Sequence, residues 1–204
     1  MPDKPTDNYR SILLFGPPGS GKGTQGRILG AIPGFCFVSM GDILRSLETG
    51  SHTAWQAQQY IESGNLVPPG LAVSAWLEHM AREKMTGFQP ERDLLILDGL
   101  PRNIEQATLL QPHLKTELIL HLTCADENFL SARIHQRNEG REDDMDDEVI
   151  HHRFDVYRRE TLPLLEWFPG RLIVVIDAAA SPLGVLGQIV TTLNTELSTS
   201  PALV

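Results

Sequence analysis

Short apolar runs separated by longer polar stretches form the hydrophobic pattern of this 204-residue chain. Each run is rich in Ile, Leu or Val without polar alternation, as expected for parallel strands covered on both faces. Four runs are clear: residues 11–15, 94–98, 118–122 and 172–177, with 35–39 as a weaker fifth. The stretches between them have helical spacing. The pattern therefore predicts an α/β fold with a doubly wound parallel sheet flanked by helices.

The last long polar stretch carries one helical stripe of mainly apolar residues. They recur at steps of four and three: Ile150, Phe154, Tyr157, Thr161, Leu164 and Phe168. Pro163 lies inside this stripe and lacks the backbone N–H that a helix interior uses. We therefore expect the helix to kink or divide near this proline.

Two segments interrupt the alternation of strands and helices. Residues 41–85 contain no strand-like run, only helical pieces divided by glycines and a pair of prolines, which suggests a small helical insertion. Residues 138–147 are almost wholly charged or polar and suit an exposed loop. The chain length fits a single domain over residues 1–204.

Composition and charge narrow the function classes. Seventeen basic against twenty-six acidic residues give a net charge of −9, which argues against broad binding to nucleic acid or to an anionic membrane surface. Phosphate ligands stay possible, because they need only a local cluster of basic residues. No apolar run approaches the roughly 18 residues of a membrane-spanning helix. Cys36 and Cys124 are far apart and outside any metal-ligand spacing, so we expect neither disulfide nor zinc site, and a soluble cytoplasmic protein.

The strongest chemical signal follows the first strand directly, where residues 16–24 read GPPGSGKGT. Glycines let the backbone curl so that its N–H groups point at phosphate oxygens, and the next helix adds its dipole. Lys22 adds a charge near the β- and γ-phosphates. The usual pattern has a hydroxyl residue after the lysine, whereas here Gly23 stands there and Thr24 follows. The alternative is a plain turn with a solvated lysine, but the order of strand, loop and helix favours a triphosphate site.

A second constellation follows the strand at residues 94–98. Asp98 ends that strand on the ligand-binding edge of the sheet, beside the phosphate loop, where a carboxylate can order Mg²⁺-bound water. Arg102 follows a glycine and a proline, so it projects from a fixed turn. Alternatively, Asp98 caps a helix and Arg102 lies on the surface. Two sites on one edge favour the first interpretation.

The third feature is a series of arginines and acids toward the C-terminal half: Arg133, Arg137, Arg141, Asp143, Asp144 and Arg153. Arg133 and Arg137 lie four apart and share one helical face. Phosphoryl transfer spreads negative charge over several oxygens, which an arginine clamp away from water stabilises. Taken alone, such a run is more often a solvated helix. The arginine series therefore indicates catalysis only because the phosphate loop is present in the same chain.

Together these motifs resemble those of the adenylate kinases, in that family's order, over residues 11 to about 190. The matching segments are GPPGSGKGTQ from residue 16, SMGDILR from 39, GNLVP from 64, LDGLPRNIEQ from 97, the Arg and Asp segment, and VIDA from 175. The combination is highly specific for nucleoside monophosphate kinases, although no single motif is. The resemblance implies a P-loop fold with a five-stranded core, a helical monophosphate-binding lobe at about 40–70 and a minimal lid at about 137–147.

The resemblance also implies roles on the ATP side. The ATP phosphates would be held by Gly19, Ser20, Gly21, Lys22, Gly23 and Thr24, and Lys22 would follow the transferred group. Arg133 would stack on the ATP base. Arg137, Arg141 and Arg153 would clamp the phosphoryl group in transfer. Asp98 would hold the cofactor Mg²⁺ through water rather than directly, and Asp143 would hold a lid arginine.

On the AMP side, Arg45 and Arg102 would grip the α-phosphate, with Arg141 and Arg153 reaching it during transfer. Met40, Val67 and Gln106 would border the base. A primary amide both donates and accepts hydrogen bonds, which suits the adenine edge that carries the N6 amino group. We therefore expect Gln106 to favour AMP over CMP and UMP.

The sequence departs from the family at several places. Met40 stands where adenylate kinases usually carry Thr and pyrimidine monophosphate kinases carry Ala, and Leu100 replaces an aromatic residue. Only three residues separate Arg137 from Arg141, which leaves no room for the family's zinc-bearing long lid. The spacing from Arg141 to Arg153 is one residue longer than usual.

We therefore expect a monomeric phosphotransferase that catalyses reversible, Mg²⁺-dependent transfer between ATP and AMP, giving two ADP without a covalent intermediate. Met40 leaves a CMP, UMP or other nucleoside monophosphate kinase open as an alternative. A nucleotide-binding protein that has lost turnover is the other alternative. Single-turnover phosphoryl transfer separates binding from chemistry.

Overall fold

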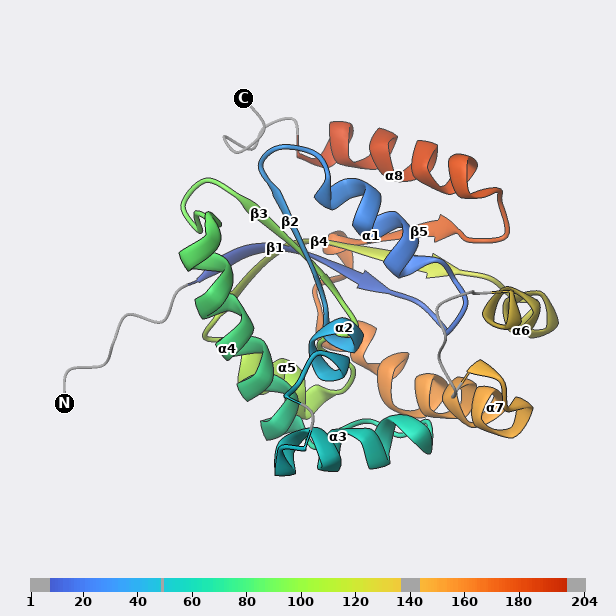
Figure 1. Ribbon diagram of the computed structural model, residues 1–204. Coiled ribbons are helices and arrows are strands. Elements are labelled where there is room, and N and C mark those ends of the chain that lie inside the picture. Colours follow the sequence, from blue (N-terminus) through green and yellow to red (C-terminus); the bar gives the residue numbers. More distant parts are fainter. Residues whose placement is uncertain (1–7, 49, 137–143, 198–204) are drawn as a thin grey trace.

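A five-stranded parallel sheet forms the centre of the computed structural model, which describes residues 8–48, 50–136 and 144–197 (Figure 1). The strand order is β2-β3-β1-β4-β5, and every neighbouring pair is parallel. The strands are β1 (Tyr9–Phe15), β2 (Phe35–Ser39), β3 (Leu94–Asp98), β4 (Leu114–Thr123) and β5 (Ile173–Asp177). The prediction of a doubly wound parallel sheet is confirmed, and each predicted apolar run coincides with a strand.

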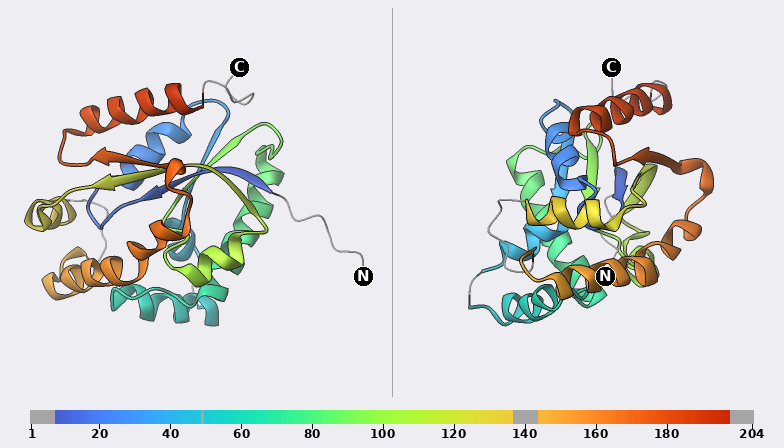
Figure 2. Two further views of the ribbon diagram at one scale, coloured as in Figure 1. Left: turned by 180° about the vertical axis from the view of Figure 1, so that it is seen from behind. Right: turned by 90° about the vertical axis from the view of Figure 1, so that its right-hand side faces the viewer.

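Both faces of the sheet are covered by helices, as Figure 2 shows from behind and from the side. Successive strand residues point to opposite faces, so Ile12 and Leu14 pack with α1 (Lys22–Gly30) and α8 (Pro182–Glu196). Leu13 and Phe15 belong to the other core cluster, which includes residues of α4 (Pro69–Thr86) and α5 (Ile104–Leu110). This double burial explains why the strands lack polar alternation.

The helical stretch at residues 41–85 divides into two parts. Helix α4 packs on the sheet, with Trp76 fully buried and its ring edge-on to Tyr9 at a centroid distance of 5.6 Å. The short helices α2 (Met40–Arg45) and α3 (His52–Glu62) lie below the sheet in Figure 1, and Ala57 is the buried residue of α3. The inserted part is therefore limited to the segment with α2 and α3 and is shorter than the predicted insertion at residues 41–85.

Beyond the carboxyl ends of the strands, α6 (Glu127–His135) and α7 (Asp147–Val156) pack together through a small apolar cluster. After α7 the chain widens into a π-helical turn, η2 (Tyr157–Thr161), in which the Leu162 N–H donates to the Tyr157 carbonyl. Two 3₁₀ turns follow, η3 (Pro163–Trp167) and η4 (Gly170–Leu172). The predicted division of the helix near Pro163 is thus confirmed.

Within the described residues, every helix is too short or too polar to cross a membrane. Cys36 and Cys124 are both free thiols.

Candidate active site

One cavity at the carboxyl-end edge of the sheet gathers most of the predicted site residues. Those lining it are Gly19, Gly21, Lys22, Gly23, Thr24, Met40, Arg45, Val67, Asp98, Arg102, Gln106 and Arg153. Ser20 is buried beneath the loop, and Arg133 lies outside the lining residues. The predicted lid residues Arg137, Arg141 and Asp143 lie outside the described residues.

The phosphate loop joins β1 to α1. Gly19 and Gly21 have φ values of 77° and 91°, a region that residues with a side chain rarely adopt. A Cβ atom at Gly19 would also come within 2.5 Å of the Leu130 carbonyl oxygen of α6. Gly21 precedes α1 without a side chain to cap it, so the first N–H groups of the helix face the loop. This arrangement is typical of an anion site.

Lys22 is the first residue of α1, and its ammonium group bends back into the loop. Nζ donates to the carbonyl oxygens of Gly16 at 2.7 Å and Pro17 at 2.9 Å, and lies 3.4 Å from the hydroxyl of Ser20. These contacts hold a positive charge at the centre of the loop, where a bound phosphate would lie.

The last residue of β3, Asp98, and the turn that follows, with Arg102, line the same cavity. The Arg102 N–H donates to Oε1 of Gln106 at 2.7 Å, and the Arg102 carbonyl accepts from the hydroxyl of Thr161 at 2.8 Å. Its side chain folds over Gly99, whose carbonyl accepts from Nε at 3.0 Å. The backbone of Arg102 is therefore held from both sides, by α5 and by η2.

Gln106 is almost fully buried, with 2% of its surface exposed. It lies in the first turn of α5, whose N-cap Asn103 accepts a hydrogen bond from the Gln106 N–H at 3.0 Å. Because Oε1 accepts from Arg102, the amide presents Nε2 as its remaining polar atom. A ligand in the cavity would therefore find a hydrogen-bond donor at Nε2, whereas the sequence led us to expect both a donor and an acceptor.

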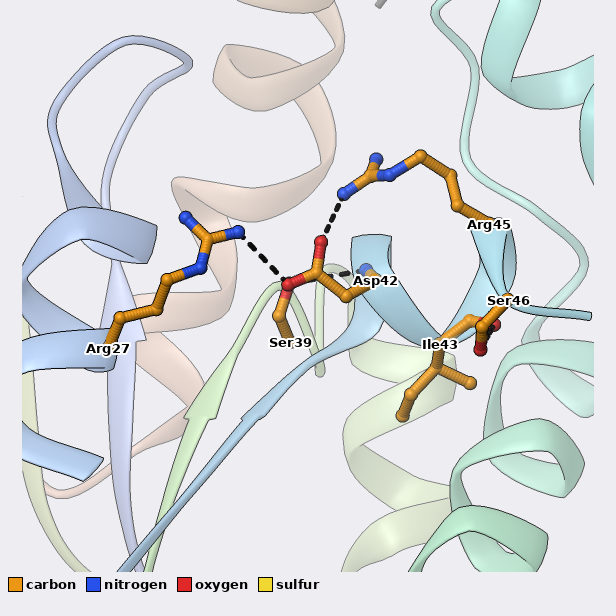
Figure 3. Close-up of polar contacts among 6 residues, drawn as sticks. All are labelled: Arg27, Ser39, Asp42, Ile43, Arg45 and Ser46. Carbon is orange, nitrogen blue, oxygen red and sulfur yellow. Dashed lines mark hydrogen bonds and ion pairs between the residues drawn. The ribbon is translucent and has the colours of Figure 1, made fainter. Parts of the chain in front are cut away.

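The lobe supplies the opposite wall. Two buried apolar residues of this wall line the cavity. Met40 begins α2 and is 3% exposed, and Val67 precedes α4 and is 6% exposed. Arg45, in the last turn of α2, donates from Nη2 to Asp42 Oδ1 at 2.5 Å. Asp42 also accepts from Arg27 of α1 at 3.1 Å (Figure 3).

Arg153 reaches the cavity from α7 and is held by a buried acid. Its Nη1 donates to Oδ1 of Asp144 at 2.8 Å, and the Asp144 side chain is 3% exposed. The role implied for Asp143, holding an arginine of the lid, concerns a residue outside the described ranges and stays a prediction. Among the described residues, Asp144 is the acid that fixes an arginine of this series.

Arg133 is held beside the cavity rather than in its wall. Its guanidinium donates to the carbonyl oxygens of Ala178 at 2.6 Å and Ala180 at 3.0 Å, in the turn after β5. The same group lies 4.3 Å from the centroid of the Phe129 ring. These contacts fix a flat cation between α6 and that turn. Its stacking on the ATP base stays a prediction.

The sequence reasoning missed a buried pair beneath the phosphate loop. His121 of β4 lies with its Nε2 2.8 Å from the hydroxyl of Tyr157, which lines the cavity. Burial, together with the charge of Lys22, lowers the pKa of His121, and burial raises the pKa of Tyr157 to about 12. A neutral imidazole and a protonated phenol therefore share this hydrogen bond, and its direction follows from the tautomer of His121. The one available signal was a histidine inside an otherwise apolar strand.

This pair predicts a pH dependence of stability. The native pKa of His121 lies below its ordinary value of 6.5, so below that pH the unfolded chain binds more protons than the native one. Stability from the neutral imidazole is therefore complete above that value and is lost as pH falls through the native pKa. His121→Gln keeps an acceptor for Tyr157 but does not titrate.

We expect the free energy of unfolding of the wild type to fall more steeply than that of His121→Gln between about pH 7.5 and 5.5. Urea unfolding at several pH values measures both slopes, and the other histidines cancel in the comparison. Equal slopes would contradict the prediction.

The charge around the cavity is opposite to that of the whole chain. Five cationic side chains and one carboxylate are among the described residues that line it: Lys22, Arg27, Arg45, Arg102, Arg153 and Asp98. The chain as a whole carries −9. Such a local excess of positive charge suits a ligand with several phosphate groups.

Comparisons with known proteins all point to one family. The family model described as adenylate kinase matches residues 14–172. The adenylate kinase of Mycolicibacterium vanbaalenii is 36% identical over 171 residues, which cover 80% of this chain and 88% of that protein. The adenylate kinase of Encephalitozoon cuniculi is 36% identical over 184 residues, covering 89% and 96%. That of Corynebacterium urealyticum is 34% identical over 176 residues, covering 83% and 91%.

Proposed function

This chain belongs to the adenylate kinase family and is thus a phosphotransferase of the nucleoside monophosphate kinase class, and from this we propose that it converts ATP and AMP into two ADP. The observation that carries the proposal is the single cavity in which the phosphate-loop lysine faces the arginines of the turn and the lobe. Such a cavity holds donor and acceptor phosphates together, which is most of what phosphoryl transfer requires.

On the ATP side, the phosphate loop would bind the β- and γ-phosphates through its N–H groups. Lys22 would exchange its contacts with the carbonyl oxygens of Gly16 and Pro17 for phosphate oxygens. Its charge would then follow the group in transfer. Arg153, held by Asp144, would stabilise the charge that spreads over the equatorial oxygens. We assign Arg137 and Arg141 to the same clamp on the family pattern.

On the AMP side, Arg45 and Arg102 would grip the α-phosphate from two directions, the lobe and the turn after β3. Gln106 would donate from Nε2 to a ring nitrogen of adenine, N1 or N7. Val67 and Met40 would cover the base with apolar surface. Met40 has a flexible thioether, which packs on a flat ring without offering a hydrogen bond.

The residues present fit a Mg²⁺ ion that comes with the nucleotide. The described residues contain no group of three or more His, Cys, Asp or Glu that could hold a metal by themselves. Mg²⁺ in such enzymes keeps several waters and takes one or two carboxylates plus substrate phosphates. Asp98 lines the cavity beside the phosphate loop and would hold those waters. The ion would supply charge neutralisation at the phosphates.

The oligomeric state and the cellular location of the protein are part of the same proposal. A monomer would suffice for transfer if the phosphate-loop lysine and the arginines of this one cavity act together on both nucleotides. Two free cysteines suit the cytoplasm, where thiols stay reduced. The lobe at about residues 40–70 would close over the monophosphate.

A panel of monophosphates with ATP as donor tests the proposal. We expect ADP to form with AMP, and kcat/KM for AMP to exceed those for CMP and UMP by about tenfold or more, since a misplaced buried polar group costs ~1–3 kcal/mol. Phosphorus NMR follows the products directly. A preference for CMP or UMP would contradict the base assignment and leave the kinase class intact. ATP binding without transfer to any monophosphate would instead favour a nucleotide-binding protein that has lost turnover.

A further inference from the structure

A carboxylate shared by two arginines joins the helix of the phosphate loop to the lobe. Asp42 Oδ2 accepts from Arg27 Nη2 at 3.1 Å, and Asp42 Oδ1 accepts from Arg45 Nη2 at 2.5 Å. Figure 3 shows the two guanidinium groups approaching the carboxylate from opposite sides. Arg27 comes from α1, which begins at Lys22, and Arg45 from α2.

The position of Asp42 is fixed by the start of α2. Its N–H donates to the hydroxyl of Ser39, the N-cap residue, at 3.3 Å (Figure 3). Its carbonyl accepts from the Ser46 N–H at 3.0 Å. A Cβ atom at Gly41 would lie 3.0 Å from Nη2 of Arg45. The Arg45 guanidinium therefore packs closely over Gly41 while it contacts Asp42, and it lines the cavity there.

Arg27 also lies near the phosphate loop itself. A Cβ atom at Gly23 would be 3.6 Å from Nη1 of Arg27 and 3.6 Å from Oδ2 of Asp98. The guanidinium of Arg27 thus lies at the junction of the phosphate loop, the β3 turn and the lobe. Its contact with Asp42 crosses from the ATP side of the cavity to the AMP side.

We propose that Arg27 is a positioning residue for the AMP phosphate, acting through Asp42 on Arg45. The inference rests on the proposed function, because it takes Arg45 as a phosphate-binding residue. With Arg27 on Oδ2, Asp42 engages Arg45 through Oδ1, and the Nη1 and Nε groups of Arg45 can face the phosphate. Without Arg27, the carboxylate can turn and take Arg45 with both oxygens, the geometry that arginine and carboxylate favour. Arg45 is then withdrawn from the substrate.

The first measurement is steady-state kinetics of Arg27→Gln. We expect KM for AMP to rise about three- to fivefold, the size of effect typical of a partly exposed ion pair, with kcat and KM for ATP changed by less than about twofold. Arg27→Lys keeps the charge and should recover part of the loss. Arg159→Gln is the matched control, because Arg159 is an exposed arginine paired with Glu160 outside the cavity lining. It should leave all three parameters unchanged.

A double-mutant cycle with Asp42→Asn separates this route from simple charge attraction. If Arg27 acts through Asp42, adding Arg27→Gln to Asp42→Asn should change KM for AMP by less than about 1.5-fold. An effect of Arg27 that persists in the Asp42→Asn protein would overturn the inference, because it would mean direct attraction of the phosphate. Equal changes in kcat and in both KM values would overturn it as well. Melting temperatures of all variants verify that they fold.

Arg45→Gln distinguishes failure of the inference from failure of the site. We expect it to raise KM for AMP by about tenfold or more, since it removes a charged hydrogen bond to the phosphate. If it does so while Arg27→Gln has no effect, the inference alone is wrong. If Arg45→Gln leaves KM for AMP unchanged, the phosphate assignment fails and takes the inference with it.

Discussion

Replacement of Lys22 by alanine is expected to lower kcat for ADP formation by about a hundredfold or more, because a single electrostatic stabiliser of the transferred group is worth several kcal/mol. The ammonium lies inside the phosphate loop on the carbonyl oxygens of Gly16 and Pro17. No second cation reaches that position among the described hydrogen bonds of the loop. Steady-state rates with ATP and AMP, corrected for the fraction folded, measure the loss.

Lys115→Ala is the matched control for this experiment. Lys115 is 64% exposed on β4 and pairs loosely with Glu117 at 3.8 Å, outside the lining of the cavity. It should keep the rate of the wild type. A Lys22→Ala protein with nearly full kcat would mean that the loop does not hold the reacting phosphate.

The second large effect is expected for Gln106→Leu, which should cut kcat/KM for AMP by roughly ten- to a hundredfold. Leucine removes the Nε2 donor that would face the base, and it also leaves the Arg102 N–H without its acceptor at 2.7 Å. Gln106 is 2% exposed, so water does not freely replace the hydrogen bonds that its amide loses. Kinetics with AMP, CMP and UMP measure the effect.

Kinetics with AMP, CMP and UMP separate the two roles of Gln106, which are its contact with the base and its hydrogen bond to the Arg102 N–H. A loss through Arg102 weakens the phosphate grip and should affect all monophosphates equally, whereas a loss of base contact should affect AMP most. Gln111→Leu, on the exposed end of the same helix, is the control and should have no effect. An equal loss for every monophosphate would contradict the role of Gln106 in choosing the base.

The sheet was predictable because its strands are continuous apolar runs, but strand lengths were not. β1 and β4 extend beyond the runs into polar residues, where Arg10 donates to Glu117 at 2.7 Å across neighbouring strands. This pairing depends on residues 107 positions apart, which a local pattern does not contain. The role of α4 was hidden for the same reason, since its apolar residues reveal a partner only once Tyr9 is placed beside Trp76.

The candidate site also has a part that the sequence could predict and a part that it could not. The phosphate loop and the turn around Arg102 are local motifs whose chemistry depends on residues close in sequence, so the sequence could identify them. The contacts that hold those residues come from distant segments. Thr161 reaches Arg102 across 59 positions, and His121 meets Tyr157 across 36. The contact between Asp144 and Arg153 spans nine positions, and the arginine and acid spacing alone did not indicate it.

The contrast between an acidic chain and a cationic cavity has a consequence for which phosphate compounds the protein can sort from the cellular pool. A polynucleotide would bring many phosphates close to a chain whose net charge is −9, and long-range repulsion would disfavour its binding. A mononucleotide carries its whole charge into the cavity at once. We therefore expect the charge distribution to favour small nucleotides over RNA and DNA as ligands of this cavity.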